Sequence, residues 1–564
     1  MASDTAELIL QARAWLAEDP DPETREELAG LLDSATATPP SGGQDAALAE
    51  LADRFGGMLQ FGTAGLRGEL GAGPMRMNRA VVIRAAAGLA AYLRRQDTTG
   101  TVVIGYDARY RSADFARDTA AVMTGAGLDA VLLPRPLPTP VLAFAVRHLG
   151  AVAGVTVTAS HNPPRDNGYK VYLGDGSQIV PPADAGIAAE IAAVKSLADV
   201  ELAESGWETL GEEIVNAYLA RTDAVLTGGS PRDVRVVYTP LHGVGRDTLL
   251  AAFERAGFPA PVVVPEQGEP DPAFPTVAFP NPEEPGAMDL AFAAARAAAP
   301  DLVIANDPDA DRCAVAVPAP GTPAGWRMLR GDETGALLAT HLVHKRAAGT
   351  FATTIVSSSL LSRIARAAGV PYEETLTGFK WLARTDGLRY AYEEALGYCA
   401  DPAGVRDKDG ITAALLIAEL AAELKQSGRD LADLLDDLAV EYGLHATDQL
   451  SVRVQDVSVI TEAMKRLRGE PPAKLAGLAV TGAEDLALGT DRLPPTDGLR
   501  YTLAGDGVES ARVIVRPSGT EPKLKCYLEV VVPVGSAGRL ADARTTADAV
   551  LATLKTDLSE AAGI

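Results

Sequence analysis

The chain has 564 residues, too many to share one hydrophobic core, so we expect three or four domains. A formal net charge of −24 and a sequence pI near 4.7 argue against nucleic acid or an anionic membrane as a partner, because the mean field of the protein repels both. Its three cysteines, Cys313, Cys399 and Cys526, are widely spaced and odd in number, which favours a reducing compartment over a disulfide framework or a thiolate metal site.

The N-terminal stretch has no basic segment ahead of an apolar one, and no uncharged apolar run is long enough to cross a bilayer. We therefore expect a soluble, cytoplasmic protein. Residues 5–33 and 44–57 are predicted as amphipathic helices, separated by a Pro- and Gly-rich loop at 38–43. The Gly-rich segment 61–68 follows, and its Arg67 can fork onto a phosphate, although a Gly-rich turn with a solvated arginine is a common alternative.

One pattern then occurs three times: a β-branched strand, a polar turn, a helix, and a glycine that precedes an apolar residue. The glycine suits the left-handed position just past a helix, and the apolar residue can pack back on the last turn. The strands and helix ends are 102–104 with 126–128, 234–238 with 256–258, and 353–356 with 368–370. Three copies predict three related α/β domains. Chance similarity among α/β units would preserve this order of elements without a duplication.

Residues 156–170 contain the sequence Thr-Ala-Ser-His-Asn-Pro, in which a β-branched strand at 155–158 runs into a loop of Asn, Pro and Gly. Ser160 therefore lies at a strand end, where α/β sheets hold ligands, and His161 and Lys170 follow within the same segment. The pattern is compatible with a nucleophilic serine with acid/base groups nearby. It fits a polar turn whose serine shares a proton equally well, so this stretch alone leaves both interpretations open.

Three aspartates, Asp307, Asp309 and Asp311, alternate directly after an apolar strand. Acids at alternate positions of an extended segment point the same way, and they repel one another unless a hard cation lies among them. We therefore predict a metal site for Mg²⁺. An EF-hand calcium loop begins similarly but requires Gly and Glu where this chain has Arg312 and Pro318. A solvated acidic turn is disfavoured by the apolar strands on both sides.

Segments 378–380, 393–398 and 405–410 combine acids and cations, which bind sugar hydroxyls by accepting and donating in pairs. Glu394 is the residue that we expect to bridge two hydroxyls. For this group the residues alone favour the alternative, surface acids on a helix.

After about residue 450 the pattern changes to strands at 501–503, 510–515 and 523–532 and a helix at 538–560, which predicts a smaller α+β domain. The loop between the last two strands reads Arg-Pro-Ser-Gly-Thr-Glu-Pro-Lys, and its hydroxyls, glycine N–H groups and two flanking cations predict a phosphate clamp. An ordinary hairpin turn is the alternative.

In this order the motifs Phe-Gly-Thr-Ala-Gly-Leu-Arg, Thr-Ala-Ser-His-Asn-Pro, Asp-Pro-Asp-Ala-Asp-Arg, the Glu-containing loop and Arg-Pro-Ser-Gly-Thr-Glu-Pro resemble the α-D-phosphohexomutase superfamily over residues 61–530. The resemblance implies three related α/β domains plus a smaller C-terminal α+β domain around one central cleft. The implied ranges are 1–220 for the N-terminal helices and the phosphoserine domain, 221–335 for the metal-binding domain, 336–450 for the sugar-recognition domain, and 451–564 for the phosphate-binding domain.

The resemblance also implies a phosphosugar mutase, an isomerase that interconverts hexose 1-phosphate and hexose 6-phosphate, glucose first and mannose second. It works through a phosphoserine and a hexose 1,6-bisphosphate. The implied catalytic residues are Ser160, His161, Lys170, Arg67 and Lys408; the implied Mg²⁺ ligands are Asp307, Asp309, Asp311 and Ser160. The implied substrate-binding residues are Lys380, Glu394, Arg312, Arg516, Ser518, Gly519, Thr520 and Lys523.

One departure leaves the sugar open: many members read Gly-Glu-x-Ser-Gly-His where this chain places Leu396 and Tyr398 at the Ser and His positions. The loop resembles a branch that contains phosphopentomutases and glucose-1,6-bisphosphate synthases, which are the alternatives, beside a phosphatase that lets water attack. The expected partners are small-molecule phosphosugars, with a sugar 1,6-bisphosphate as activator, and neither nucleic acid nor membrane. Monomer and homodimer both stay open, as does the role of residues 1–60.

Overall fold

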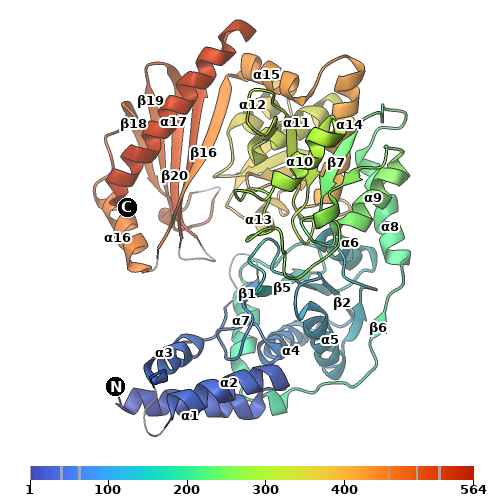
Figure 1. Ribbon diagram of the computed structural model, residues 1–564, viewed down its shortest axis with the longest axis vertical. Coiled ribbons are helices and arrows are strands. Elements are labelled where there is room, and N and C mark those ends of the chain that lie inside the picture. The colour runs from blue at the N-terminus through green and yellow to red at the C-terminus, as the bar shows by residue number, and fades with distance from the viewer. Residues whose placement is uncertain (1, 38–41, 61–64, 455, 491–492, 519–522) are drawn as a thin grey trace.

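The computed structural model describes residues 2–37, 42–60, 65–454, 456–490, 493–518 and 523–564. Along this part of the chain, three helices precede four sheets of six, five, four and six strands. Figure 1 shows the N-terminal helices and the first sheet at the bottom, the second and third sheets above them, and the last sheet at the upper left.

The N-terminal segment folds as α1 (Ala2–Glu18), α2 (Pro22–Ala35) and α3 (Gln44–Arg54). The prediction of a single helix over 5–33 is wrong, because the sequence Asp-Pro-Asp-Pro at 19–22 interrupts it. Proline lacks the N–H that a continuing helix needs, whereas at the first helical position it is tolerated. The Asp21 carboxylate then caps α2 by accepting a hydrogen bond from the Glu23 N–H at 3.1 Å.

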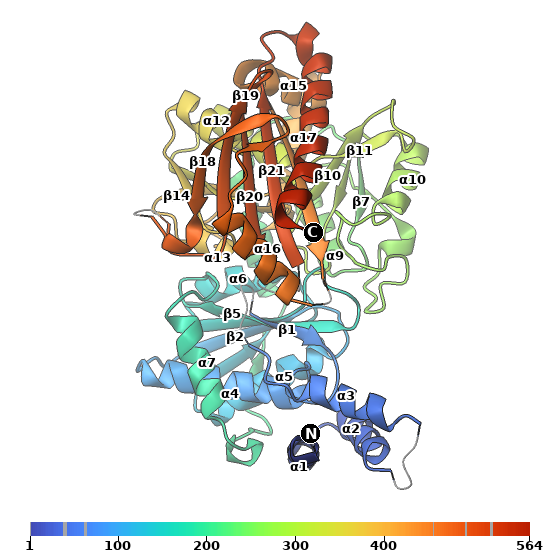
Figure 2. The same ribbon diagram turned by 90° about the vertical axis from the view of Figure 1, so that its left-hand side faces the viewer.

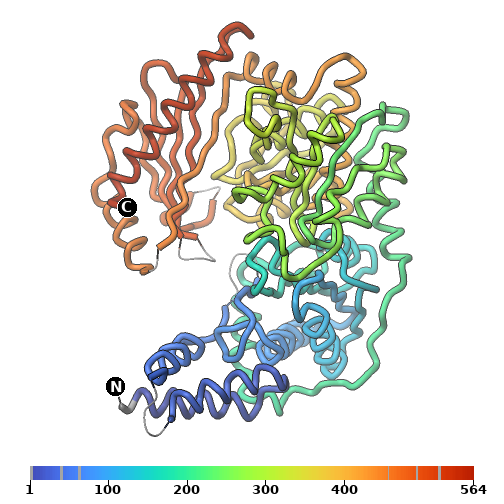
Figure 3. Tube along the Cα trace, in the orientation of Figure 1, coloured from blue at the N-terminus to red at the C-terminus, as the bar shows by residue number. Residues whose placement is uncertain are grey.

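The first sheet has the strand order β1-β5-β4-β2-β3-β6, in which β2 pairs in parallel with β3 and β4 while β5 is antiparallel to β4 and β1. Its strands are β1 (Leu66–Glu69), β2 (Thr101–Tyr106), β3 (Asp129–Leu132), β4 (Ala153–Val157), β5 (Asp166–Leu173) and β6 (Glu208–Thr209). Its helices are α4 (Arg79–Arg95), α5 (Ser112–Gly125), α6 (Thr139–His148) and α7 (Ala183–Ala193). The chain after α7 runs along the outer edge of the molecule to the second unit (Figure 3).

The second and third sheets have the orders β11-β10-β9-β7-β8 and β13-β12-β14-β15. The strands are β7 (Val236–Thr239), β8 (Val262–Val263), β9 (Leu302–Ala305), β10 (Ala314–Pro318), β11 (Trp326–Met328), β12 (Thr350–Thr354), β13 (Tyr372–Thr375), β14 (Leu388–Glu393) and β15 (Gly397–Cys399). The helices are α8 (Glu213–Thr222), α9 (Gly245–Ala256), α10 (Asp289–Ala298), α11 (Gly331–His344), α12 (Leu360–Ala368), α13 (Phe379–Leu382), α14 (Gly410–Gln426) and α15 (Leu431–Tyr442). One buried apolar cluster extends from the first sheet through the second into the third, so these units share a continuous core.

The predicted threefold pattern is present in the structure. Gly127, Gly257 and Gly369 all have positive φ, at 81°, 78° and 68°. In each copy the N–H of the next residue donates to the carbonyl five residues earlier: Leu128 to Met123, Phe258 to Phe253 and Val370 to Ala365. These bonds close the helix ends as a Schellman motif does, and they fix where each chain leaves its helix.

The last sheet is antiparallel, with the order β16-β21-β20-β19-β18-β17, and α16 and α17 lie across one of its faces (Figure 2). Its elements are β16 (Leu444–Arg453), α16 (Ser458–Gly469), β17 (Lys474–Leu475), β18 (Leu478–Asp485), β19 (Leu499–Gly505), β20 (Val508–Pro517), β21 (Lys523–Val532) and α17 (Leu540–Ala562). The predicted domain boundaries near 220, 335 and 450 fall within α8, α11 and β16, and the residue limits of the domains stay a prediction. Among the described residues, no helix has the length and apolar character needed to span a membrane.

The last sheet meets the third unit mainly through polar contacts. The Glu529 carboxylate accepts from Ser358 Oγ at 2.6 Å and from the Ser359 N–H at 2.8 Å, and the Arg512 guanidinium donates to the carbonyls of Ile355 and Ser357. A small apolar cluster that includes Ile355, Val356, Leu376, Ile514 and Tyr527 joins the two units.

We expect Gly331→Ala to lower the free energy of unfolding by about 1–3 kcal/mol, the usual cost of overpacking. A Cβ on Gly331 would overlap the carbonyl oxygen of Glu394 and come within 2.7 Å of its carbonyl carbon, both of them backbone atoms. Gly30→Ala in α2 is the matched control, because an added Cβ meets nothing within 4 Å there. Urea denaturation of the three proteins measures the effect, and an unchanged midpoint for Gly331→Ala would contradict this packing.

Candidate active site

Ser160 lies in a tight turn just past β4, with a left-handed φ of 51° that is uncommon for a residue other than glycine. Its N–H donates to Thr158 Oγ1 at 2.9 Å. The buried guanidinium of Arg109 holds the rest of the turn by donating to four backbone carbonyls, those of Ser160, Asn162, Pro163 and Asp166, at 2.6 to 3.1 Å. Because so many bonds converge on this turn, the serine hydroxyl has a fixed position. No motif in the sequence indicates this role of Arg109.

The loop after β9 brings three aspartates to this hydroxyl. Ser160 Oγ donates to Asp307 Oδ2 at 2.7 Å, a bond that joins the first sheet to the second. One carboxylate oxygen from each of Asp307, Asp309 and Asp311 lies within 4.8 Å of the others, and all three side chains are fully buried. The convergence of these acids, predicted from their alternation, is therefore present.

Two lysines neutralise part of this charge. Lys170 Nζ lies 2.7 Å from Asp309 Oδ2 and 3.0 Å from Asp311 Oδ2, and Lys408 Nζ lies 3.4 Å from Asp311 Oδ2. Burial alone would lower the pKa of either lysine, but the neighbouring carboxylates outweigh it and raise both. Both side chains are therefore ammonium ions at neutral pH.

The charge balance of the aspartates suits a cation. Burial, followed by repulsion from the other two acids, raises the pKa of Asp307 well above its usual range. Burial also raises the pKa of Asp309 and Asp311, but the ion pairs with Lys170 prevail and the net pKa of both is lowered. The Oδ1 atoms of Asp309 and Asp311 are buried without a hydrogen-bond partner. Unpaired buried carboxylate oxygens are the ligands that Mg²⁺ takes, so these residues fit the predicted ion.

His161 and two arginines surround the serine. His161 Nδ1 lies 3.2 Å from Ser160 Oγ, and burial, Arg312 and Arg67 lower the pKa of His161 well below its usual value, so its imidazole is neutral. Arg67 Nη1 donates to Asn162 Oδ1 at 3.3 Å, and Arg312 Nε lies 3.8 Å from Asp307 Oδ2. The Nε atoms of both arginines have no hydrogen-bond partner, which leaves donors for an anionic group.

The predicted sugar loop after β14 lies against the metal loop. The Cys313 N–H donates to the Leu396 carbonyl at 3.0 Å, and Arg312 forms a β-bridge with Gly397. Glu394 Oε2 accepts from Ser357 Oγ at 2.9 Å, which orients the carboxylate.

Lys380 lies on α13, where burial lowers its pKa, and its ammonium is 5.9 Å from the Trp381 ring centre. The charged side chains that act on its pKa are Asp184 and Arg384, not the aspartates of the metal loop. The structure therefore does not join Lys380 to the serine and the metal loop as closely as it joins the other predicted residues.

The predicted phosphate clamp lies between β20 and β21. Arg516 and Lys525 are opposite each other across the two strands, and the Ser518 N–H donates to the Lys523 carbonyl at 2.8 Å. Gly519 and Thr520 lie outside the described residues. Burial and the nearby positive charges of Arg312, Lys523 and Arg516 lower the pKa of Lys525, against the pull of Glu394.

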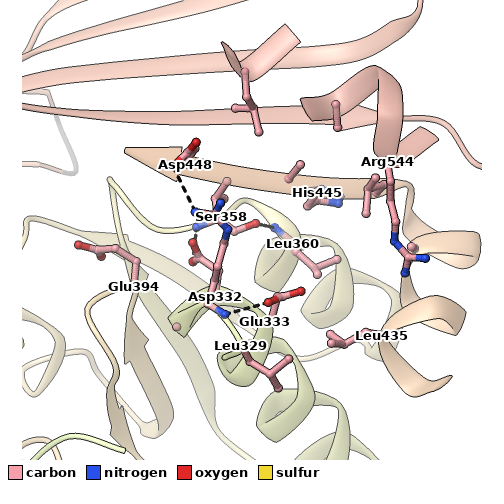
Figure 4. A pocket seen from close by; sticks show the side chains of 18 of the residues that line it. Leu329, Asp332, Glu333, Ser358, Leu360, Glu394, Leu435, His445, Asp448 and Arg544 are labelled. Atoms are coloured by element: carbon pink, nitrogen blue, oxygen red, sulfur yellow. Dashed lines mark hydrogen bonds and ion pairs between the residues drawn. The ribbon is translucent and has the colours of Figure 1, made fainter. Parts of the chain in front are cut away.

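A cavity of about 880 Å³ separates the third unit from the last sheet. Figure 4 shows Glu394 at one end of it and Arg544 at the other, with Asp332, Ser358 and His445 between them. Glu394 therefore borders an open space between the two units.

Comparison with known proteins assigns four consecutive family models to the chain. They are described as phosphoglucomutase/phosphomannomutase α/β/α domains I, II and III and the C-terminal domain, and they match residues 58–198, 216–321, 330–442 and 464–547. Residues 1–57 precede the first of these matches.

Relatives with curated names are similar along most of their length. A Haemophilus influenzae protein named "Probable phosphomannomutase" is 48% identical over 462 residues, 81% of this chain and 93% of that protein. The mouse phosphopentomutase is 35% identical over 94% of this chain and 92% of its own, and a Staphylococcus aureus phosphoglucomutase is 32% identical over 86% of this chain and 92% of its own.

A solved structure shares the fold: a phosphoglucomutase/phosphomannomutase family protein from Burkholderia thailandensis has a TM-score of 0.68 at 19% identity, covering 89% of this chain and 97% of that one. The four family models follow one another in the predicted order, and their matched ranges contain the sequence motifs described above. The chain thus belongs to the α-D-phosphohexomutase superfamily, as an isomerase of the phosphoglucomutase/phosphomannomutase type.

Proposed function

We propose that this mutase interconverts hexose 1-phosphate and hexose 6-phosphate, with glucose as the first sugar and mannose as the second. The observation that carries the proposal is the 2.7 Å bond between Ser160 Oγ and Asp307 Oδ2, with Lys170 on the two remaining acids. A hydroxyl at a carboxylate cluster, among fixed cations, is suited to carry a phosphoryl group.

In the proposed reaction the bond between phosphorus and Ser160 Oγ breaks, and a bond from phosphorus to a sugar hydroxyl forms. His161, whose Nδ1 is 3.2 Å from Ser160 Oγ, is the candidate base for the hydroxyl proton. Lys170 and Lys408 are candidate proton donors, and Arg67 and Arg312 offer positive charge to the moving group. When bound by the three aspartates and Ser160, Mg²⁺ supplies Lewis-acid stabilisation of the phosphoryl oxygens.

The product of the first transfer is a sugar bisphosphate, which turns end for end and returns its other phosphate to Ser160. In this proposal Arg516, Ser518 and Lys523, with Gly519 and Thr520, hold the phosphate that is not being transferred, while Glu394 and Lys380 receive sugar hydroxyls. A clamp that recognises phosphate rather than one carbon accepts either end of the sugar. A sugar 1,6-bisphosphate is the expected activator, because it phosphorylates Ser160 directly.

The second candidate function is that of a phosphopentomutase or of a glucose-1,6-bisphosphate synthase. Leu396 is fully buried in an apolar cluster, and the buried Tyr398 hydroxyl donates to the Gly331 carbonyl at 3.2 Å. Neither side chain is placed to bind a sugar, so the loop offers fewer polar groups than the Ser and His of other members. The 35% identity to the mouse phosphopentomutase also supports this candidate.

We expect coupled assays, with sugar bisphosphate present, to give the highest kcat/KM for glucose 1-phosphate, then for mannose 1-phosphate. Ribose 1-phosphate is the third substrate in the comparison. A highest value for ribose 1-phosphate would establish the second candidate instead. Release of inorganic phosphate equal to the substrate consumed would indicate a phosphatase, and would contradict the mutase proposal.

A further inference from the structure

The three N-terminal helices enclose a residue of the first unit. Ala72, which follows β1, is fully buried in the apolar cluster of α1, α2 and α3, together with Leu28, Leu32 and Leu51. The first family model begins at residue 58, after these helices. Their core is incomplete without Ala72, and the chain at Ala72 is fixed by them.

Two charged side chains of the helices also hold both backbone groups of Ala72. Glu27 Oε2 of α2 accepts from the Ala72 N–H at 2.9 Å, and Arg54 Nη1 of α3 donates to the Ala72 carbonyl at 3.2 Å. The two side chains form an ion pair at 2.7 Å. The Met75 N–H in turn donates to the Arg54 carbonyl at 3.1 Å. The segment after β1 is thus bound by side chains and backbone groups of the N-terminal helices.

The strand that this segment continues carries Arg67. β1 has only four residues and lies at the edge of its sheet, paired with β5 alone, where Arg67 is opposite Gly168. So short an edge strand has few ladder bonds of its own to fix it. At Gly68 an added Cβ would lie 3.1 Å from the Leu59 side chain, so the residues just after α3 also pack closely on β1.

The helices are in turn fixed to the body of the first unit. The Glu18 carboxylate accepts from Ser196 Oγ at 2.6 Å and from Arg84 Nη2 at 3.1 Å, and Asp21 pairs with Arg111. Arg111 is two residues beyond Arg109, which holds the Ser160 turn. The N-terminal helices therefore connect β1, which carries Arg67, to the same loop that supports Ser160.

We propose that the N-terminal helices act as a clamp that positions Arg67 for phosphoryl transfer, with Glu27 and Arg54 as the positioning residues. The inference rests on the proposed role of Arg67 and adds a function for residues 1–60. A displacement of about 1 Å of a catalytic group can cost up to ~100-fold in rate, so loosening the clamp should act on kcat more than on KM.

The test compares Glu27→Gln, Arg54→Lys and the control Glu26→Gln, an exposed glutamate next to Glu27 on α2. We expect Glu27→Gln to lower kcat about 10-fold with KM changed less than about 2-fold, and Arg54→Lys to lower it less. Glu26→Gln should match the parent enzyme. Parent-like kcat in Glu27→Gln overturns the proposal. If Glu27→Gln does not fold, Arg54→Lys carries the test: a loss of kcat smaller than about 10-fold is then expected, and a parent-like kcat overturns the proposal.

A double-mutant cycle separates positioning from general stability. If Glu27 acts through Arg67, then Glu27→Gln should have no further effect on kcat in an Arg67→Ala background. Full additivity of the two losses would overturn the clamp. Failure of the proposed role of Arg67 would give a different result, because Arg67→Ala alone would then retain parent kcat. A severely impaired Arg67→Ala together with a parent-like Glu27→Gln would contradict only the positioning role of the N-terminal helices.

Discussion

Replacing Ser160 with alanine is expected to lower kcat for the sugar phosphate mutase reaction by at least ~10⁴-fold, the scale on which enzymes lose activity with their nucleophile. The change removes the contacts of Oγ with Asp307 and His161 and leaves the backbone bonds of the turn in place. Arg109 still binds the carbonyls of the turn, and Thr158 still accepts from the N–H of position 160. The protein should therefore stay folded while the phosphoenzyme disappears from its mass spectrum.

Ser177→Ala is the matched control, since Ser177 Oγ also donates to an aspartate, Asp175, at 2.6 Å in the same unit. This control should keep parent kcat, which separates loss of the nucleophile from loss of a serine–aspartate bond. Mutase turnover retained by Ser160→Ala would refute the covalent route.

Asp309→Asn is expected to lower kcat by about 10³-fold, since the Lewis-acid contribution of a metal ion is worth several kcal/mol. Asp309 Oδ2 accepts hydrogen bonds from Lys170 Nζ and Thr139 Oγ1, each at 2.7 Å, and Asp309 Oδ1 has no hydrogen-bond partner. An amide removes the charge that the cation requires. Isothermal titration with Mg²⁺ should show the loss of binding directly, and chelation of the parent enzyme should abolish turnover until Mg²⁺ is returned.

The control for this variant comes from a second acidic group, His341 with Glu419 and Glu423. Glu419 already accepts from Lys345 Nζ, the Thr227 N–H and Ser230 Oγ, so we interpret this group as a structural contact between helices and linker. Glu423→Gln should leave Mg²⁺ binding unchanged. If Glu423→Gln lost magnesium binding and Asp309→Asn kept it, the assignment of the metal to the three aspartates would be contradicted.

Much of the site could be predicted because its chemical groups are concentrated in short stretches of sequence. Ser160 and His161 are adjacent, and the three aspartates alternate within five positions, so local spacing was enough to single them out as candidates. Arg109 could not be found this way, because its value comes from carbonyls that lie about fifty residues further along the chain. Lys525 had a local signal, the alternation with Lys523 on one strand face, which the prediction of a loop clamp did not use.

The helices at the N-terminus show the opposite limit. Their apolar periodicity predicted helices, but it did not reveal the break at 19–22, where two prolines and a capping aspartate decide the boundary. Nor does any local pattern show that Ala72 completes their core, because that contact depends on how β1 is turned relative to α2. Contacts between segments distant in sequence are therefore the part that had to come from the structure.

The polar seam between the third unit and the last sheet has an energetic consequence. Its polar contacts, such as those of Glu529 and Arg512, can be replaced by contacts with water, and its apolar contacts lie in the cluster around Ile355 and Tyr527 and where Ala439 of α15 packs on the core of the last sheet. Separating the two faces would expose polar groups, which lower the heat capacity, together with apolar groups, which raise it, so the two contributions to the heat-capacity change oppose each other. Temperature would then alter the association of the two faces only weakly, whereas dissolved salt would weaken the ion pairs that join them, Arg500 with Glu374 and Arg363 with Glu509.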